Sequence, residues 1–366
     1  MNVVVVTGSA GLVGSEAVDL FSRHFDLVIG MDNGMRQRLF GADAAVTGNL
    51  AEVERLANYR HHVVDIRDHA AVAAVLSEYG SDVKLVVHTA GQPSHEWATD
   101  YTLTDFAINA QGTLNVLEAV RQYCSDAVVV ITSTNKVYGS APNDLPLVET
   151  GTRWEVDPGH PYREHGIDES MNVDQTDHTF FGVSKLAADI AAQEYGRRLG
   201  MKVGIFRCSC LTGPRHAGVA LHGFLSHLTR SAVRGTPYTI IGHHGKQVRD
   251  NLDARDLAEM FLHFYRNPRP GEVYHAGGGR ERSCSVLEAI SRIEQMTGRE
   301  LAVKYEPQHR FADAKWWITD TRKFRQHYPE WEPKYSLDET LASMQQRWTL
   351  AENEDAALAE RTSTNV

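Results

Sequence analysis

Three glycines spaced three residues apart, Gly8, Gly11 and Gly14, lie between an apolar run and an amphipathic run near the start of the chain. The first permits a tight turn, the second lets backbone N–H groups approach a pyrophosphate, and the third lets a helix pack closely on a strand. Asp32 ends the second apolar run, 18 residues beyond Gly14. A carboxylate there accepts hydrogen bonds from the hydroxyls of an adenosine ribose and repels a 2′-phosphate. The pattern predicts a dinucleotide site that prefers NAD to NADP.

The spacing of cysteine and histidine does not predict a metal site. Cys208 and Cys210 would share one face of a strand, but no second ligand pair accompanies them. The histidines of the next segment, His216, His222 and His227, lack the i, i+3 or i, i+4 spacing of helical metal ligands. Four scattered cysteines do not make a disulfide framework and suit a reducing cytoplasm.

The composition narrows the class of partner. The 366 residues include 37 Lys and Arg against 47 Asp and Glu, a net charge of −10. This acidity argues against a nucleic-acid polymer or an anionic membrane as partner, while leaving room for a local basic pocket. No apolar run approaches the roughly 20 residues of a membrane span, and no basic region precedes the first apolar run. We therefore expect a cytoplasmic protein without a signal peptide.

Short apolar runs alternate with runs of helical periodicity over much of the chain. The predicted strands are residues 2–7, 27–31, 62–64, 85–88, 127–132 and 203–207. The predicted helices between them are residues 13–23, 52–57, 70–79, 106–123 and 184–199. Continuous apolar strands separated by helices indicate a parallel sheet covered on both faces. With right-handed crossovers, this predicts an α/β fold with a doubly wound parallel sheet.

The pattern loosens after about residue 212, where helices mix with short strands and Pro/Gly breaks. We predict a dinucleotide-binding domain over residues 1–211 and a smaller substrate lobe over 212–345, with segments such as 240–260 returning to the first domain. The polar, aperiodic residues 149–177 predict a long loop over the site. The small and charged residues 351–366 predict a flexible tail.

Several motifs resemble those of extended short-chain dehydrogenases/reductases. The glycine spacing is the variant found in that group, and residues 88–92 (HTAGQ) are similar to the exit of its fourth strand. Residues 133–139 (STNKVYG), with 115–123 (NVLEAVRQY) and 245–250 (GKQVRD), resemble the CDP-paratose 2-epimerase (CDP-tyvelose epimerase) branch of nucleotide-sugar epimerases. The resemblance covers roughly the first 340 residues. It implies a Rossmann-like fold, an NAD cofactor and a homodimer formed by the helices at 106–123 and 184–199.

The resemblance also implies which residues contact the cofactor. Asp65 and Ile66 match the pair that brackets the adenine, and Asn109 lies in a helix that supports the sheet. The full implied set is Gly8, Gly11, Leu12, Val13, Gly14, Asp32, Asn33, Asp65, Ile66, Ala90, Gly91, Gln92, Asn109, Lys185 and Cys208.

The catalytic motif departs from the family pattern at one residue. In this superfamily a Tyr-x-x-x-Lys pair on one helix face does the acid/base work, and the lysine bonds the nicotinamide ribose and lowers the pKa of the phenol. Here Lys185 is in place, but Phe181 stands where the tyrosine should be. Phe181 has no ionisable oxygen and cannot exchange a proton with a sugar hydroxyl. Thr134 matches the hydroxyl that bonds the reacting sugar oxygen.

Two interpretations of this departure follow: loss of catalysis with NAD retained, or proton transfer by another group. The candidates are His95 in the loop after the fourth strand, His178 near Phe181, Lys136, Thr134 with a partner, and Tyr138. His95 ranks first among the histidines because its loop borders the nicotinamide pocket in the family. We favour relocation of the proton transfer.

The residues after Thr134 discriminate between reaction types. The 4,6-dehydratases of the superfamily have Asp-Glu there, whereas this chain has Asn135 and Lys136, as the 2-epimerase branch does. Asn135 cannot donate a carboxyl proton, so simple dehydration is disfavoured, although a desolvated Lys136 could remove a carbon-bound proton. The resemblance implies substrate contacts by Gln92, Thr134, Arg215, Arg249 and Lys315.

The sequence thus predicts NAD-dependent, redox-neutral epimerisation of a nucleotide-linked sugar, at C2 by the resemblance. The first alternative is a dehydratase of a nucleotide sugar or nucleoside that passes through the same transient ketone. The second is an NAD-binding pseudoenzyme that regulates a partner.

Overall fold

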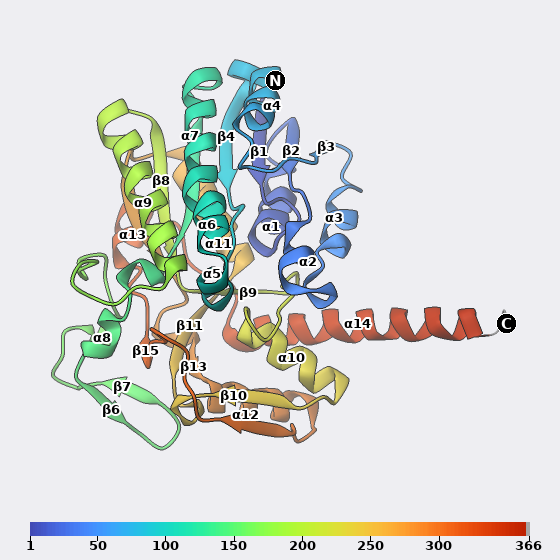
Figure 1. Ribbon diagram of the computed structural model, residues 1–366, viewed down its shortest axis with the longest axis vertical. Helices are drawn as coiled ribbons and strands as arrows, with labels where there is room; N and C mark the ends of the chain where they lie inside the picture. Colours follow the sequence, from blue (N-terminus) through green and yellow to red (C-terminus); the bar gives the residue numbers. More distant parts are fainter. Residues whose placement is uncertain (364–366) are drawn as a thin grey trace.

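The computed structural model describes residues 1–363 and is built around a seven-stranded parallel sheet (Figure 1). The strand order is β12-β8-β5-β4-β1-β2-β3, so the chain leaves the central strand β1 first in one direction and then in the other. The strands are β1 (Val3–Thr7), β2 (Leu27–Met31), β3 (Tyr59–His62), β4 (Val83–His88), β5 (Val128–Thr134), β8 (Lys202–Cys208) and β12 (Glu272–Ala276). The predicted doubly wound α/β fold is confirmed. The order reverses between β1 and β4, which is where such sheets bind ligands.

Alternate residues of β1 explain why helices cover both faces of the sheet. Val3 and Val5 belong to one buried cluster, and Val4 and Val6 belong to the other. The first cluster is covered by α4 (His69–Tyr79), α7 (Gly112–Tyr123) and α9 (Phe180–Leu199). The second is covered by α1 (Leu12–Phe21), α3 (Thr47–Val53) and α11 (Ala254–Arg266).

The smaller lobe lies at the carboxyl end of the sheet strands (Figure 1). It contains a four-stranded sheet of β9 (Cys210–Thr212), β11 (Val248–Asp253), β13 (Ser283–Ser285) and β15 (Trp316–Trp317). Beside it lie the parallel pair β10 (Tyr238–Ile241) and β14 (Val303–Glu306), and the helices α10 (Phe224–Arg234) and α12 (Val286–Thr297). Leu225, Leu228, Ile290 and Ile293 join these helices in a separate apolar core.

Residues 240–260 pack against the large sheet without joining it. β11 pairs within the small sheet, but its Leu252, with Leu257 and Met260 of α11, belongs to the apolar cluster on one face of the large sheet. The strand that returns is β12, which pairs with β8 from Glu272 to Ala276. The expected loop over residues 149–177 is mostly irregular but contains β7 (Trp154–Val156), paired with β6 (Leu147–Glu149), and α8 (Tyr162–His165).

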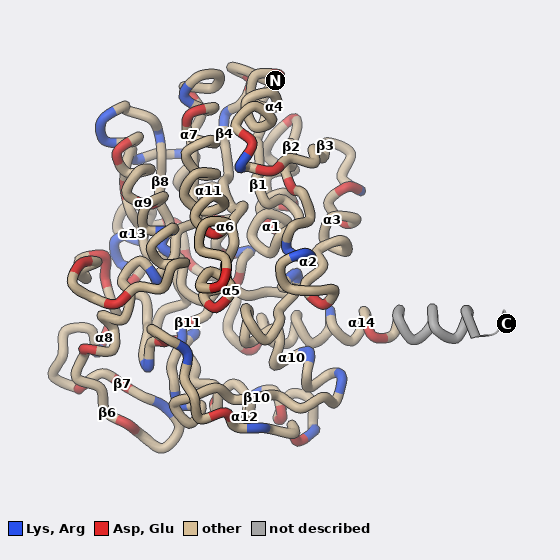
Figure 2. Tube along the Cα trace, viewed as in Figure 1, with Lys and Arg blue, Asp and Glu red and all other residues tan. Residues whose placement is uncertain are grey.

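The C-terminal segment forms helix α14 (Leu337–Ser363), which projects sideways from the body of the molecule (Figure 1). The sequence predicts a flexible tail over residues 351–366, whereas residues 351–363 continue this helix and 364–366 lie outside the described residues. In the described part of the chain, no helix is both long enough and apolar enough to span a membrane. Basic and acidic residues are interspersed along the trace (Figure 2).

Candidate active site

The glycine loop forms a cradle that side chains would fill. The backbone N–H of Gly8 donates to the Met31 carbonyl at 2.7 Å, and Gly8 has a φ of +70°. A Cβ on Gly8 would lie 2.8 Å from the backbone nitrogen of Ala90, and one on Gly14 would lie 2.0 Å from the Gly8 carbonyl oxygen. Gly11 begins α1 without a side-chain cap. The first N–H groups of α1 are therefore available to an anion in the cavity.

Asp32 lies directly after β2 and faces the same cavity. Its Oδ2 accepts a hydrogen bond from the Ala10 N–H at 3.1 Å, and its Oδ1 accepts one from the Gly34 N–H at 2.8 Å. These bonds fix the carboxylate while each oxygen keeps a lone pair for a ribose hydroxyl. The geometry fits an adenosine ribose without a 2′-phosphate.

Most of the predicted cofactor residues line one cavity of about 550 Å³ between the sheet and the smaller lobe. The predicted residues on its wall are Gly8, Gly11, Leu12, Val13, Gly14, Asp32, Asn33, Asp65, Ile66, Ala90, Gly91, Gln92 and Lys185. The Asp65 carboxylate is held by the Arg67 guanidinium at 2.6 Å, which keeps the pKa of Asp65 below its usual value. The glycine cradle, the Asp32 carboxylate and this continuous wall fit NAD.

Two predicted cofactor residues do not line the cavity. Asn109 supports it from behind: its Oδ1 accepts from the Gln92 N–H at 2.9 Å, and its Nδ2 donates to the Gln92 carbonyl at 3.1 Å. Asn109 thus holds the loop after β4, and it lies in a π-helical segment, Ala107–Gln111, before α7. Cys208 is buried at the end of β8, and burial raises the pKa of its thiol to about 12. Neither side chain lies on the cavity wall, and a contact of either with the cofactor stays a prediction.

Helix α9 positions Phe181 and Lys185 one turn apart on the cavity wall. Thr179 caps the helix by accepting a hydrogen bond from the Gly182 N–H at 3.1 Å, so α9 begins at Phe180. The Lys185 ammonium donates to the Thr132 carbonyl at 2.6 Å, and burial lowers its pKa. Both side chains line the cavity, which is consistent with the predicted match of Phe181 to the tyrosine of the motif.

The other predicted catalytic residues meet around Phe181. The Phe181 ring is buried and stacks on the His95 imidazole, with ring centroids 5.1 Å apart. Thr134, Asn135 and Lys136 follow one another along the same wall at the end of β5. Burial lowers the pKa of His95 to about 3 and that of Lys136 to about 8. His95 is therefore a neutral imidazole at ordinary pH, whereas Lys136 can lose its proton.

Two of the proposed substitute bases do not line the cavity. The Nε2 of His178 bonds the Val173 carbonyl at 2.9 Å, in the loop before α9. The Tyr138 hydroxyl is buried between His275 Nε2 and Arg207 Nη1, each at 2.7 Å. Burial raises the pKa of Tyr138 far above its usual value, so this phenol is a structural group.

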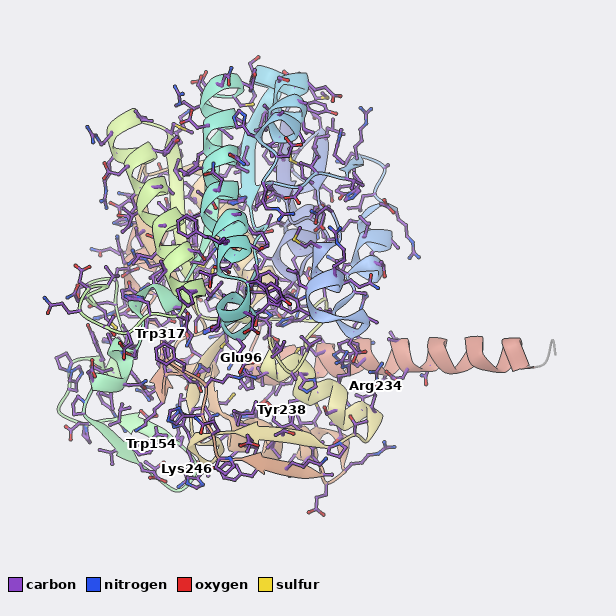
Figure 3. All side chains as sticks on the ribbon, in the orientation of Figure 1. Glu96, Trp154, Arg234, Tyr238, Lys246 and Trp317 are labelled. Carbon is purple, nitrogen blue, oxygen red and sulfur yellow. The ribbon has the colours of Figure 1, made fainter. Side chains whose placement is uncertain are left out.

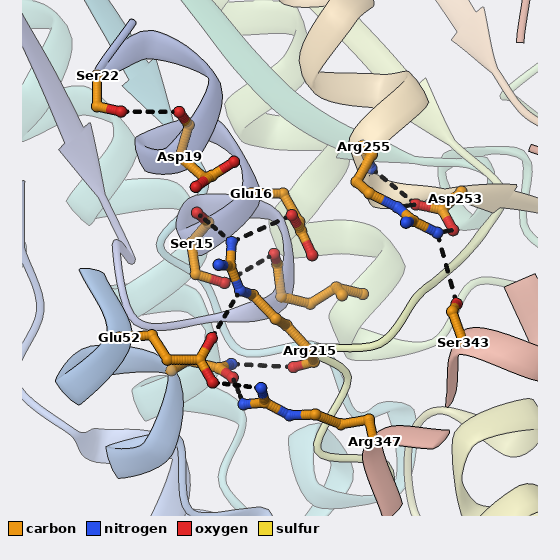
Figure 4. Close-up of polar contacts among 12 residues, drawn as sticks. Ser15, Glu16, Asp19, Ser22, Glu52, Arg215, Asp253, Arg255, Ser343 and Arg347 are labelled. Carbon is orange, nitrogen blue, oxygen red and sulfur yellow. Dashed lines mark hydrogen bonds and ion pairs between the residues drawn. The ribbon is translucent and has the colours of Figure 1, made fainter. Parts of the chain in front are cut away.

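The predicted substrate cations separate in the structure. Arg249 lines the cavity and pairs with Asp313 at 2.5 Å. Arg215 lies outside the cavity lining, where its guanidinium pairs with Glu16 at 3.1 Å and Glu52 at 3.2 Å (Figure 4). Arg215 thus joins α1 and α3 to the segment after β9, and its contact with a substrate stays a prediction.

Lys315 is also absent from the cavity lining. Its ammonium lies 5.0 Å from the centre of the Trp154 ring, beside the turn of the β6–β7 hairpin. Lys315 thus packs between the hairpin and β15, and its contact with a substrate stays a prediction. The side chains in Figure 3 show Trp154 in the hairpin, away from Glu96 at the mouth of the site.

The sequence does not predict that several further residues line the cavity. Arg310 pairs with Glu96 of α5 (His95–Asp100) at 3.0 Å and donates to the Ala220 carbonyl at 2.7 Å, which ties the segment after β9 over the cavity. His216 and His222 of this segment line the cavity, and both ring nitrogens of His216 are buried without a hydrogen-bond partner among the described residues. Their positions depend on contacts between distant segments and have no local sequence signal.

The chain belongs to the NAD dependent epimerase/dehydratase family, whose model matches residues 4–277. The parallel sheet and the glycine cradle are those of a Rossmann-like protein of the extended short-chain dehydrogenase/reductase type. A CDP-paratose 2-epimerase of Salmonella typhi is 32% identical over 94% of this chain and 98% of its own. A probable dTDP-glucose 4,6-dehydratase of Sinorhizobium fredii is 27% identical over 97% of this chain and 90% of its own.

Solved structures support the same fold. A UDP-glucuronic acid 4-epimerase from Bacillus cereus, in complex with UDP-glucuronic acid and NAD, superposes with a TM-score of 0.76 at 22% identity, over 95% of this chain and 99% of that one. The family is NAD-dependent and its members are enzymes, so the predicted cofactor and enzyme class are confirmed.

Proposed function

We propose that the protein epimerises C2 of a nucleotide-linked sugar without net oxidation. The observation that carries this proposal is the polar wall of the cavity after β5: Thr134, Asn135 and Lys136 line it, and no carboxyl group follows Thr134. A dehydratase must protonate a departing hydroxyl, and the Asn135 amide cannot do so. The 32% identity to a CDP-paratose 2-epimerase over nearly the whole chain supports the same reaction.

Each residue of the site then has a defined task. When bound, NAD supplies a reversible hydride acceptor for the sugar carbon. The Thr134 hydroxyl holds the sugar oxygen at that carbon, and Lys185 holds the cofactor ribose beside it. Phe181 supplies an apolar wall against which the sugar ring can turn between its two faces. Arg249 offers a positive charge to the anionic part of the substrate. Its ion pair with Asp313 already neutralises part of that charge.

The test is turnover of CDP-, UDP- and dTDP-linked sugars by the purified protein, followed by NMR and mass spectrometry of the product. Epimerisation leaves the mass unchanged and inverts one carbon, and a deuterium placed at C2 of the substrate stays with the product. Dehydration gives a product lighter by one water. The second candidate, a dehydratase, is favoured by relatives such as the Sinorhizobium fredii protein. Absence of turnover with NAD bound would leave the pseudoenzyme.

We also propose that the protein is a homodimer built on α7 and α9. Large apolar side chains are exposed on these helices and at the end of α6 (Thr102–Phe106), including Phe106, Tyr123, Val183 and Ile190. Such an exposed apolar set is typical of a partner surface. Light scattering during size-exclusion chromatography measures the mass in solution, and Ile190→Glu should shift it to that of a monomer.

A further inference from the structure

The cavity lacks the phenol that would exchange the substrate proton. Phe181 has no oxygen, and the only tyrosine of the described residues that lines the cavity is Tyr238, on β10 of the smaller lobe. Burial raises the pKa of Tyr238 to about 12, so its hydroxyl keeps its proton. Figure 3 shows Tyr238 in the smaller lobe, below Glu96 of α5. If the proposed epimerisation is correct, another group must take the proton.

Lys136 is placed to reach the sugar oxygen that Thr134 holds. It follows Thr134 by two residues, and both side chains line the cavity. The backbone N–H of Lys136 donates to the Thr134 hydroxyl at 3.2 Å, which fixes that hydroxyl against the Lys136 backbone. Its Nζ makes a single long hydrogen bond, 3.5 Å to the Ala312 carbonyl. No carboxylate among the described side chains lies within ion-pair distance, 4.0 Å, of the Lys136 Nζ, and the more distant charge of Asp313 only partly offsets the burial that lowers the pKa of Lys136.

The groups that face Lys136 are poor bases. Asp313 is held as a carboxylate by Arg249, and its pKa lies below the usual value. The thiol of Cys210 has its pKa raised by burial to about 11 and stays protonated. The imidazole of His95, with a pKa of about 3, binds a proton too weakly to take one from an alcohol.

The remaining cations of this wall are already engaged. Lys185 donates to the Thr132 carbonyl, and Arg310 pairs with Glu96. An arginine does not lose its proton in a protein. Among these groups, Lys136 is therefore the one that is basic and has a pKa, about 8, at which it loses its proton near neutral pH, and its Nζ makes only the long hydrogen bond to the Ala312 carbonyl.

We propose that the Lys136 amine is the catalytic base and acid of this protein and replaces the tyrosine that Phe181 displaces. The inference rests on the proposed function. When the sugar carbon is oxidised, the O–H bond breaks and its proton passes to Nζ. When the carbon is reduced from its other face, the Lys136 ammonium returns the proton to the same oxygen. Two electrons leave the sugar and come back, so no external oxidant or reductant is consumed.

Activity measurements test the role directly. Lys136→Met removes the amine but keeps the chain length, and it should lower kcat/KM by about 10²–10⁴-fold while NAD binding stays unchanged. Lys136→Arg keeps the charge but cannot release it, so it should be equally slow at every pH. Because the neutral amine is the base, the rate of the unmodified enzyme should rise as the pH passes through about 8. Lys202→Met, at the opposite end of the sheet, is the matched control and should keep full activity.

Two further measurements do not depend on native turnover alone. Small primary amines should restore activity to Lys136→Ala, and the rescue should grow with the basicity of the amine. In protein labelled with 13C at the lysine Cε, NMR should show a Lys136 resonance that titrates well below the usual 10.5. A resonance titrating at the usual value, or Lys136→Met with activity within tenfold of the unmodified enzyme, would overturn the proposal. If the unmodified protein turns over no nucleotide sugar, the proposed function fails instead, and the NMR titration still decides whether Lys136 is a poised base.

Discussion

Replacing Gly14 with alanine should abolish most NAD binding without unfolding the protein. The new Cβ would lie 2.0 Å from the Gly8 carbonyl oxygen and 2.9 Å from Ser9 Cα, and both are backbone atoms that cannot rotate away. Because ordinary van der Waals contact begins at 3.4 Å, the start of α1 must retreat from the loop by about 1.4 Å. Overpacking of this kind costs about 1–3 kcal/mol of folding free energy.

The same displacement removes the N–H groups of α1 from hydrogen-bonding distance of a pyrophosphate. A hydrogen bond to a charged group contributes about 1.5–3 kcal/mol, so the loss of two such bonds weakens binding by about 3–6 kcal/mol. This corresponds to a Kd higher by about 10²–10⁴-fold. The assay is calorimetric titration of NAD into protein freed of cofactor, together with urea unfolding followed by circular dichroism.

Gly48→Ala is the control because it makes the same chemical change without the contact. Gly48 lies in α3, and the nearest atom to its new Cβ is the end of the Arg347 side chain at 4.0 Å. An alanine in a helix is more stable than a glycine by about 0.5–1 kcal/mol, so this variant should gain slightly in stability and bind NAD normally. Equal NAD affinity in Gly14→Ala and Gly48→Ala would refute the assignment of the cradle.

Three other changes test the site. Asp32→Ala removes the acceptor of the ribose hydroxyls, so it should weaken NAD binding by about tenfold, the effect of about 1–2 kcal/mol. It should also reduce the difference in affinity between NAD and NADP. A titration in which the unmodified protein binds NADP more tightly than NAD contradicts this. Lys185→Met should lower cofactor occupancy and abolish turnover with the circular dichroism spectrum unchanged, and full activity would mean that α9 is not the catalytic helix. Phe181→Tyr should leave activity modest or reduced, because the pocket now serves another base; the assay uses C2-deuterated substrate. If the unmodified protein is inactive and Phe181→Tyr creates activity, the pseudoenzyme is favoured.

The sheet and the cofactor half of the site were predictable because their signals are local. The glycine loop joins β1 directly to α1, and Asp32 ends the next strand. The apolar runs of β1 and β5 have few alternatives to a buried parallel strand. Only one of the four residues of β3 is buried, so its apolar pattern is weak. The strand begins three residues before the predicted start.

The surroundings of the substrate half were not predictable, for a common physical reason. The resemblance implies a substrate contact for Arg215, but its charge is satisfied by Glu16 and Glu52, which lie far away along the chain. A cation pairs with whichever carboxylate the fold brings near, and the sequence does not contain that distance. The same holds for Asp313, whose pairing with Arg249 decides how much charge the cavity offers.

The surroundings of Phe181 argue that the proton transfer has moved and has not simply been lost. Ser184 donates to the Asp105 carboxylate at 2.5 Å, and Asn109 donates to the other oxygen of Asp105 at 3.0 Å, so the first turns of α9 are still tied to the loop that faces the cofactor. A buried polar network of this kind is unfavourable unless every member is satisfied, and an NAD-binding protein without chemistry does not need it to orient residue 181. The network keeps Lys185 and the ring of Phe181 in register while the one ionisable oxygen is missing. This is the arrangement that we expect if, as proposed, the proton passes through Lys136 and not through residue 181.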